Sequence, residues 1–125
     1  MTHAAIDDRT SEVFFEVPDS QGERVRVLAT LVHIREDQTR FGLVEKGLYL
    51  AEGPHGRFKV WGTVPPALHR QERPFGVAAT LRGSLVELHA IVQRSEPEPC
   101  FGFLVRPTRA KVLVWGINGR ERGAA

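Results

Sequence analysis

The sequence lacks the features that staple a small fold or anchor a chain in a membrane. Its one cysteine, Cys100, excludes an intrachain disulfide framework and a cysteine-rich zinc site. No apolar run approaches the roughly 20 residues that cross a bilayer. The N-terminal residues include Asp7 and Asp8 and contain no apolar block, which is unlike a signal peptide. We therefore expect a soluble, cytoplasmic protein without a membrane partner.

Motifs for catalysis, metals and nucleotides are missing as well. The histidines are scattered, without the H-x-H or H-E-x-x-H spacing that holds a metal. Ser84 is not in a G-x-S-x-G elbow, and no glycine-rich phosphate loop occurs. Cys100 follows Pro99 without an obvious activating base, and a cysteine in that setting is usually structural. The sequence therefore predicts a non-enzymatic protein without a metal or cofactor.

The charge is small overall but unevenly distributed. The net formal charge is +2, yet residues 1–56 hold six Lys and Arg against ten Asp and Glu, whereas residues 57–125 hold eleven against five. This asymmetry indicates one basic region, which is the usual footprint of an anionic partner.

A chain of 125 residues, 42% of them hydrophobic, has the size of one domain with its own core. Alternating apolar residues predict strands in most of it, with no repeat and no alternation of helices and strands. A polar turn over 37–39 separates the first two long strands. The predicted elements are a short strand at Val13–Val17 and long strands over 23–36, 40–52 (broken near Lys46 and Gly47), 57–65 and 75–94. Residues 65–74 form a helix of at most two turns or a structured loop. A last strand over 100–106 is interrupted by Pro107, and residues 111–115 continue it or form a further edge strand.

The segment 75–94 leaves two alternatives open. Gly83 suits a bend where one long strand changes direction, as barrels require. A hairpin of two strands turning at Gly83 and Ser84 is the other reading. A helix over 84–94 is less favoured, although some apolar residues keep helical spacing.

The strand in the stretch 57–65 has an unusual outer face. With a period of two, Phe58, Val60 and Gly62 share one side, which can lie against a core. The opposite side then places the aromatic ring of Trp61 among two cations and a hydroxyl. An aromatic ring between cations is the composition expected of a nucleic-acid surface.

Three β segments, a short helix or loop and two further β segments, in about 90 residues, resemble the OB-fold, a five-stranded Greek-key barrel. The runs Gly22-Glu23-Arg24, Lys59-Val60-Trp61-Gly62 and Ala79-Thr80-Leu81-Arg82-Gly83 are similar to OB domains of bacterial and phage DNA-processing proteins. The expected fold class is all-β, or β with one short helix: an arm and short strand over 1–22, an OB-like barrel over 23–115 and a flexible tail over 116–125. A split barrel or a β-sandwich fits the strand count nearly as well.

The resemblance implies a function and a surface. OB-folds bind nucleic acid on the face of their second and third strands and on two flanking loops. A single-stranded nucleic-acid partner is therefore expected, DNA favoured over RNA, bound with little sequence dependence by aromatic stacking and phosphate contacts. The residues implied are Arg40, Phe41, Tyr49, Arg57, Lys59, Trp61 and Arg82. Against this, Phe41 and Tyr49 can be core residues, and Trp61 can pack under a helix or loop.

Two further expectations remain. A second basic group, made of Arg82, Arg94, Arg106, Arg109 and Lys111, either lines the binding groove or only solvates strand edges. The alternative function is a β-barrel protein-interaction or assembly module, with the apolar residues near 13–17 and 111–115 as its working surface. By resemblance, a homo-oligomer is expected.

Overall fold

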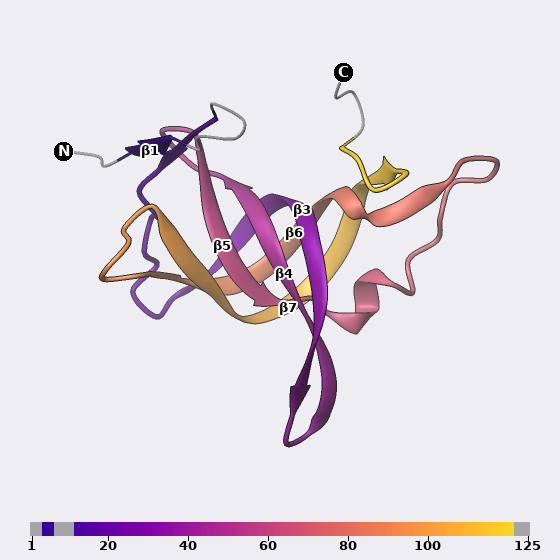
Figure 1. Ribbon diagram of the computed structural model, residues 1–125, viewed down its shortest axis with the longest axis horizontal. Coiled ribbons are helices and arrows are strands. Elements are labelled where there is room, and N and C mark those ends of the chain that lie inside the picture. Colours follow the sequence, from indigo (N-terminus) through magenta and orange to yellow (C-terminus); the bar gives the residue numbers. More distant parts are fainter. Residues whose placement is uncertain (1–3, 7–11, 122–125) are drawn as a thin grey trace.

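The structure is a computed structural model that describes residues 4–6 and 12–121 (Figure 1). In these residues, the elements are β1 (Ala4–Ile6), β2 (Val13–Phe15), β3 (Arg24–Thr39), β4 (Gly42–Glu52), β5 (Arg57–Thr63), a 3₁₀ turn η1 (Pro66–Leu68), β6 (Ala79–Arg94) and β7 (Phe101–Ile117). No helix in this part of the chain has the length and apolar character needed to span a membrane.

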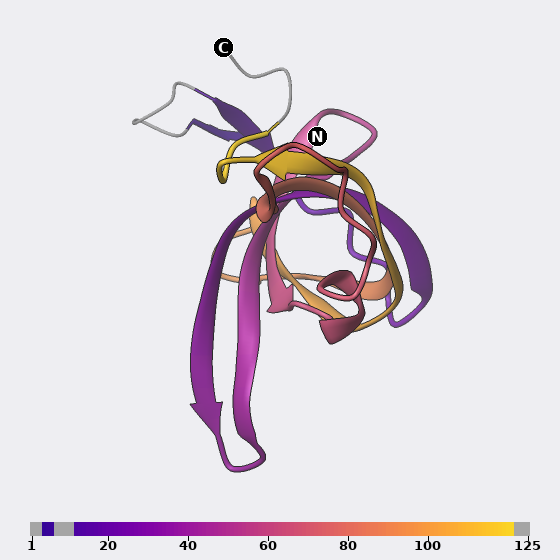
Figure 2. The same cartoon turned by 90° about the vertical axis from the view of Figure 1, so that its right-hand side faces the viewer.

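Five of the strands close into a barrel in the order β3-β4-β5-β7-β6. Paired strands are antiparallel except β5 and β7, which are parallel. β7 lies between β5 and β6 in the barrel. Figure 2 looks into the ring that these strands form. The predicted all-β, five-stranded barrel is confirmed. The β-sandwich alternative is wrong, because the sheet closes on itself.

β5 divides its residues between core and surface as its sequence predicts. Phe58, Val60 and Gly62 are buried, and the residues between them are only partly buried. Gly62 lies where β5 passes close to β7, and a Cβ at this position would lie 2.6 Å from the carbonyl oxygen of Leu104. The outward direction of Trp61 is therefore fixed by the packing on the opposite side of its strand.

β6 is one long strand bent at Gly83, which has a φ of 90°. The β6–β7 register shifts between Thr80 and Leu85, where the strand changes direction. The bent strand predicted over 75–94 is confirmed from Ala79 onwards. The hairpin and the helix considered for this segment do not form.

β7 continues through Pro107, so the predicted interruption is wrong. Between Val105 and Thr108, β7 has two residues, whereas the stretch of β6 that pairs with them has only one. The extra residue forms a β-bulge in which Arg106 has a left-handed φ of 52°. Proline lacks a backbone N–H, and a bulge tolerates it because the ladder is already disrupted there.

β3 and β4 extend beyond the barrel as a two-stranded arm over residues 36–45, which projects downwards in Figures 1 and 2. Strand pairing continues to Thr39 and Gly42, so the turn is at Arg40 and Phe41 and not in the three residues before them. The Thr39 hydroxyl accepts the Phe41 N–H and donates to the Gly42 carbonyl, at 3.1 and 2.8 Å. These hydrogen bonds stabilise a turn at residues 40–41, directly after the predicted turn at 37–39.

Two smaller predictions also fail. β4 is not broken near Lys46 and Gly47; the glycine brings β4 close to Leu31, whose Cδ1 would lie 2.5 Å from an added Cβ. The helix predicted over 65–74, for which a structured loop was the alternative, does not form: the segment is a loop that contains only the turn η1. The last residue of η1, Leu68, is fully buried and belongs to the barrel core.

The terminal segments lie against the barrel. β1 pairs with β2, and β2 packs beside β5. Phe14 and Val17 are buried. Of the predicted N-terminal arm, residues 1–3 and 7–11 lie outside the described residues. The predicted tail over 116–125 begins with the last two residues of β7, and residues 122–125 lie outside the description.

Candidate nucleic-acid interface

The outer face of β4 and β5 is built from four cross-strand pairs. Side chains alternate along a strand, and the residues between these fill the core, so the paired residues point outwards. Leu50 is covered, and most of the others are half-buried. The pairs are Lys46 with Thr63, Leu48 with Trp61, Leu50 with Lys59, and Glu52 with Arg57.

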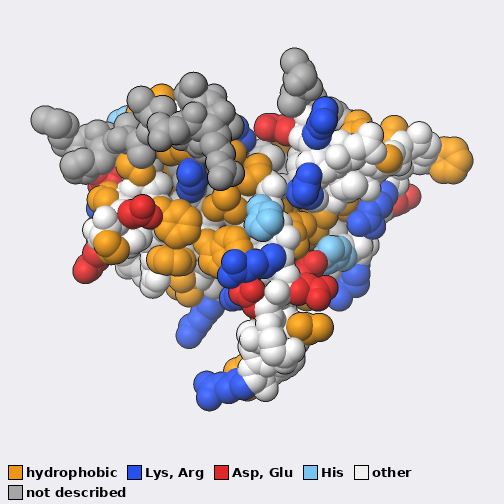
Figure 3. Space-filling view, in the orientation of Figure 1, with side chains coloured by type: hydrophobic (Ala, Val, Ile, Leu, Met, Phe, Trp, Pro, Cys, Tyr) orange, Lys and Arg blue, Asp and Glu red, His pale blue; other side chains and the backbone are white. Residues whose placement is uncertain are grey.

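β7 adds two aromatic rings to this face. In the parallel β5–β7 ladder, Phe103 lies beside Trp61 and Phe101 lies beside Lys59. The Phe101 and Phe103 rings meet edge to face, with centroids 5.5 Å apart. Phe103 keeps 41% of its surface exposed. Trp61, Phe101 and Phe103 form what we call the aromatic row, and Figure 3 shows hydrophobic side chains gathered over β5 and β7.

Cations border the row on the side of the arm. The guanidinium of Arg35, on β3, lies 4.8 Å from the centre of the Trp61 ring. Arg35 also forms an ion pair with Asp37 at 2.9 Å. Lys46 donates a hydrogen bond of 3.1 Å to the hydroxyl of Thr63. Aromatic rings and cations therefore lie together on a solvent-facing sheet, an arrangement that can accept bases and phosphates.

The opposite end of the face is covered. Arg57 contacts three carboxylates: Glu12 at 3.1 Å, and Glu52 and Glu121 at 3.6 Å. Lys59 lies 4.5 Å from the centre of a Phe14 ring that β2 places over β5. Two of the cations that the sequence predicts for phosphate contact, Arg57 and Lys59, are thus engaged by the terminal segments of the same chain.

Tyr49 is not part of the surface, and that prediction is wrong. Its side chain has no exposed area and belongs to the core. The hydroxyl donates a hydrogen bond of 3.0 Å to the Thr63 carbonyl. Burial, together with the charge of Glu45, raises the pKa of this hydroxyl far above its ordinary value. The residue therefore acts as a buried strut between β4 and β5.

Arg40 and Phe41 lie at the tip of the arm, away from the face of the barrel. Phe41 is 86% exposed, so the alternative that placed it in the core is wrong. The Arg40 guanidinium lies 5.1 Å from the centre of the Phe41 ring. The two residues form a separate exposed pair, joined to the barrel only through the arm.

Arg82 is not brought to the aromatic row. It lies near the start of β6, where Thr80 pairs with Gly116, and its Nε donates to the Gly119 carbonyl at 3.3 Å. The row lies at the other end of the β6–β7 pair, where Gln93 is opposite Phe103.

The rest of the second basic group is scattered around the barrel. Arg94 pairs with Glu16 at 3.1 Å, and Lys111 lies 3.7 Å from Glu87. The side chain of Glu87 also pairs with Arg26 at 2.7 Å, and this hydrogen-bonded arginine lowers the pKa of Glu87. These contacts favour the reading that this group solvates and braces the barrel.

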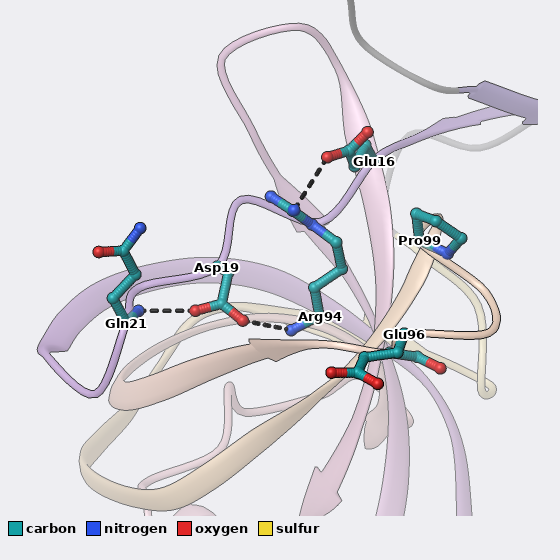
Figure 4. Close-up of a pocket in the computed structure, with 7 residues that line it drawn as sticks. Glu16, Asp19, Gln21, Arg94, Glu96 and Pro99 are labelled. Carbon is teal, nitrogen blue, oxygen red and sulfur yellow. Dashed lines mark hydrogen bonds and ion pairs between the residues drawn. The ribbon is translucent and has the colours of Figure 1, made fainter.

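A cavity of about 530 Å³ lies beside Arg94, between the segment before β3 and the loop after β6 (Figure 4). The Asp19 carboxylate accepts the backbone N–H groups of Arg94 and Gln21, at 2.9 and 2.7 Å. These two bonds, that from Arg94 first, lower the pKa of Asp19. Because the Asp19 and Glu16 carboxylates already have protein partners, we interpret their contacts as a brace between the two segments and not as a ligand site.

The described residues contain no group of three His, Cys, Asp or Glu side chains that could hold a metal ion. Burial raises the pKa of the Cys100 thiol, and Glu16 and Glu98 add to this effect. A raised pKa is opposite to the activation that a nucleophilic cysteine needs.

Sequence reasoning missed Arg35, Phe101 and Phe103 as members of the face. Phe101 and Phe103 do share one side of the predicted last strand. Only the pairing of β7 with β5, which joins residues about 40 positions apart, brings them beside Trp61. Comparisons with protein-family models, with curated proteins and with solved structures find no match to this chain.

Proposed function

We propose that this chain binds single-stranded nucleic acid, DNA in preference to RNA, without catalysis and with little dependence on sequence. The strand order fits the OB-like barrel that the sequence resembles, and β4 and β5 take the place of its binding strands. The observation that carries the proposal is the pairing of the half-buried Trp61 with the exposed Phe103, bordered by the guanidinium of Arg35.

Stacking supplies the part of the affinity that does not depend on sequence. Each base stacked on an aromatic side chain contributes about 1–3 kcal/mol. Phe103 offers a partly exposed ring to one base. A second base on Trp61 displaces the Arg35 guanidinium, which then binds the adjacent phosphate.

Phosphate contacts supply the rest. Arg35 and Lys46 border the aromatic row on the side of the arm, and Lys59 joins them once the strand displaces the Phe14 ring that covers it. About three such contacts to a single strand predict that log K falls against log salt with a slope of roughly −2.

The test is a binding titration with fluorescein-labelled dT10 at low salt, followed by anisotropy, with rU10 and a 10-base-pair duplex as competitors. We expect dT10 to bind, and the duplex to compete poorly because its bases are already stacked on one another. If rU10 binds as tightly as dT10, the proposed preference for DNA is rejected, but the binding of single strands is not. Absence of binding to either single strand at low salt refutes the proposed function.

A protein-interaction or assembly module remains the second candidate. Leu113 and Val114, on β7, are 41% and 36% exposed, so an apolar strip is available there. In contrast, Trp115 and Phe14 are buried and are not available to a partner. An oligomer in light scattering, together with no affinity for oligonucleotides, selects this second function.

A further inference from the structure

Residues 12–16, which we call the cover segment, place a carboxylate and an aromatic ring on the basic end of the outer face. Glu12 Oε1 lies 3.1 Å from Arg57 Nη1, and the Phe14 ring lies 4.5 Å from Lys59 Nζ. Phe14 is only 3% exposed, so its ring is seated against β5. A negative group on an arginine, followed by a ring beside a lysine, has the chemistry of a phosphate followed by a base.

The same alternation continues to the end of the cover segment. Glu16 Oε1 lies 3.1 Å from Nη1 of Arg94, at the rim of the barrel. Glu121, from the other end of the chain, adds a carboxylate 3.6 Å from Arg57. The basic end of the face is therefore covered by acidic and aromatic side chains from both terminal segments.

The fit of this cover to Arg57 is incomplete. The Nε and Nη2 atoms of Arg57 are buried, and neither donates a hydrogen bond to any described residue. The carboxylates of Glu52 and Glu121 stand 3.6 Å away, beyond hydrogen-bond length. Buried donors without acceptors are costly, and a phosphate, with its several acceptor oxygens, can satisfy them better.

We propose that the cover segment is an internal competitor of the nucleic acid. This inference rests on the proposed function. A strand too short to reach beyond the aromatic row binds there alone, whereas a longer strand such as dT10 lifts the cover segment and places a phosphate on Arg57. One of its bases then takes the position of the Phe14 ring beside Lys59. The cover segment thereby weakens the binding of long strands and sets the number of nucleotides that the protein occludes.

The first test is the variant Glu12→Gln, which removes the carboxylate without removing the packing of Phe14. The matched control is Glu72→Gln, which removes one negative charge from an exposed position before β6. We expect E12Q to bind dT10 at least about threefold more tightly than wild type, and E72Q to stay within about 1.5-fold of it. Equal affinities for E12Q and E72Q overturn the inference.

The second test is hydrogen exchange of the wild-type protein, which needs no variant. Exchange in the peptide that covers residues 12–16 is measured with and without saturating dT10. We expect faster exchange in the complex, because β2 leaves its place on β5. Unchanged or slower exchange overturns the inference.

These experiments distinguish failure of the internal competitor from failure of the proposed function. If wild type binds dT10 but E12Q gains nothing over E72Q, the proposed function stands and the internal competitor is rejected. If neither wild type nor E12Q binds any oligonucleotide, both are rejected.

Discussion

Removing the Trp61 ring or the Phe103 ring from the aromatic row should weaken binding strongly while leaving the fold intact. Trp61 and Phe103 project from the outside of the barrel, and Phe103 is 41% exposed, so truncation opens no cavity in the core. A lost stacking contact of about 1–3 kcal/mol corresponds to a loss of affinity of about 5- to 150-fold. Trp61→Ala and Phe103→Ala should each show a loss in this range. Because the two residues are direct neighbours, the binding free energy lost in the double variant should differ from the sum of the losses in the two single variants.

The assay is anisotropy of labelled dT10, which does not depend on tryptophan emission, with circular dichroism to check the fold. The matched control is Phe75→Ala, since Phe75 is a fully exposed ring in the segment that precedes β6. It should bind like wild type. The reasoning is refuted if both row variants bind within about twofold of wild type, or if Phe75→Ala is weakened as much as they are.

Three further predictions concern the scaffold. Tyr49→Ala should lower the free energy of unfolding by about 3–5 kcal/mol in urea titrations, because its ring is fully buried; a loss below about 1 kcal/mol contradicts the core assignment. The folded-state pKa of Asp19 lies below its ordinary 3.8. The contribution of its carboxylate to the free energy of unfolding is therefore complete above that pH and is lost as the pH falls through the lowered pKa. The stability gap between wild type and Asp19→Asn should therefore narrow below about pH 4, and a gap that widens there contradicts this account. Gly83→Ala should cost more stability than Gly76→Ala, because both have positive φ but only at Gly83 does a Cβ meet backbone, 2.4 Å away; equal melting temperatures contradict it.

Strand identity was predictable wherever the two sides of a strand differ in polarity. In β5, Phe58 and Val60 alternate with charged and half-buried residues, so the face that carries Trp61 followed from the sequence. In β4, apolar residues occur on both sides: Leu48 and Leu50 point outwards, while Tyr49 fills the core. A period of two therefore could not show which side of β4 faces the core, and Tyr49 was predicted on the wrong side.

Features that depend on distant partners could not be read from the sequence. The parallel pairing of β7 with β5 brings Phe103 to Trp61, and no local pattern encodes that choice. The bulge that admits Pro107 arises from the register of β7 on β6. The engagement of Arg57 by Glu12 likewise needs the terminal segment to fold back over the barrel.

The measurement that tests the central claim most directly is the fluorescence of Trp61 in a Trp115→Phe background. The chain has two tryptophans, so replacing Trp115 leaves Trp61 as the single tryptophan emitter. Trp115 is buried, and its Nε1 donates to the Glu72 carbonyl at 3.0 Å. Titration with dT10 should quench this emission to a plateau, and the midpoint should move to weaker affinity as salt rises, with a log–log slope of roughly −2. Emission that stays constant up to high oligonucleotide concentration, or quenching that does not respond to salt, contradicts a binding site on the outer face of β4, β5 and β7.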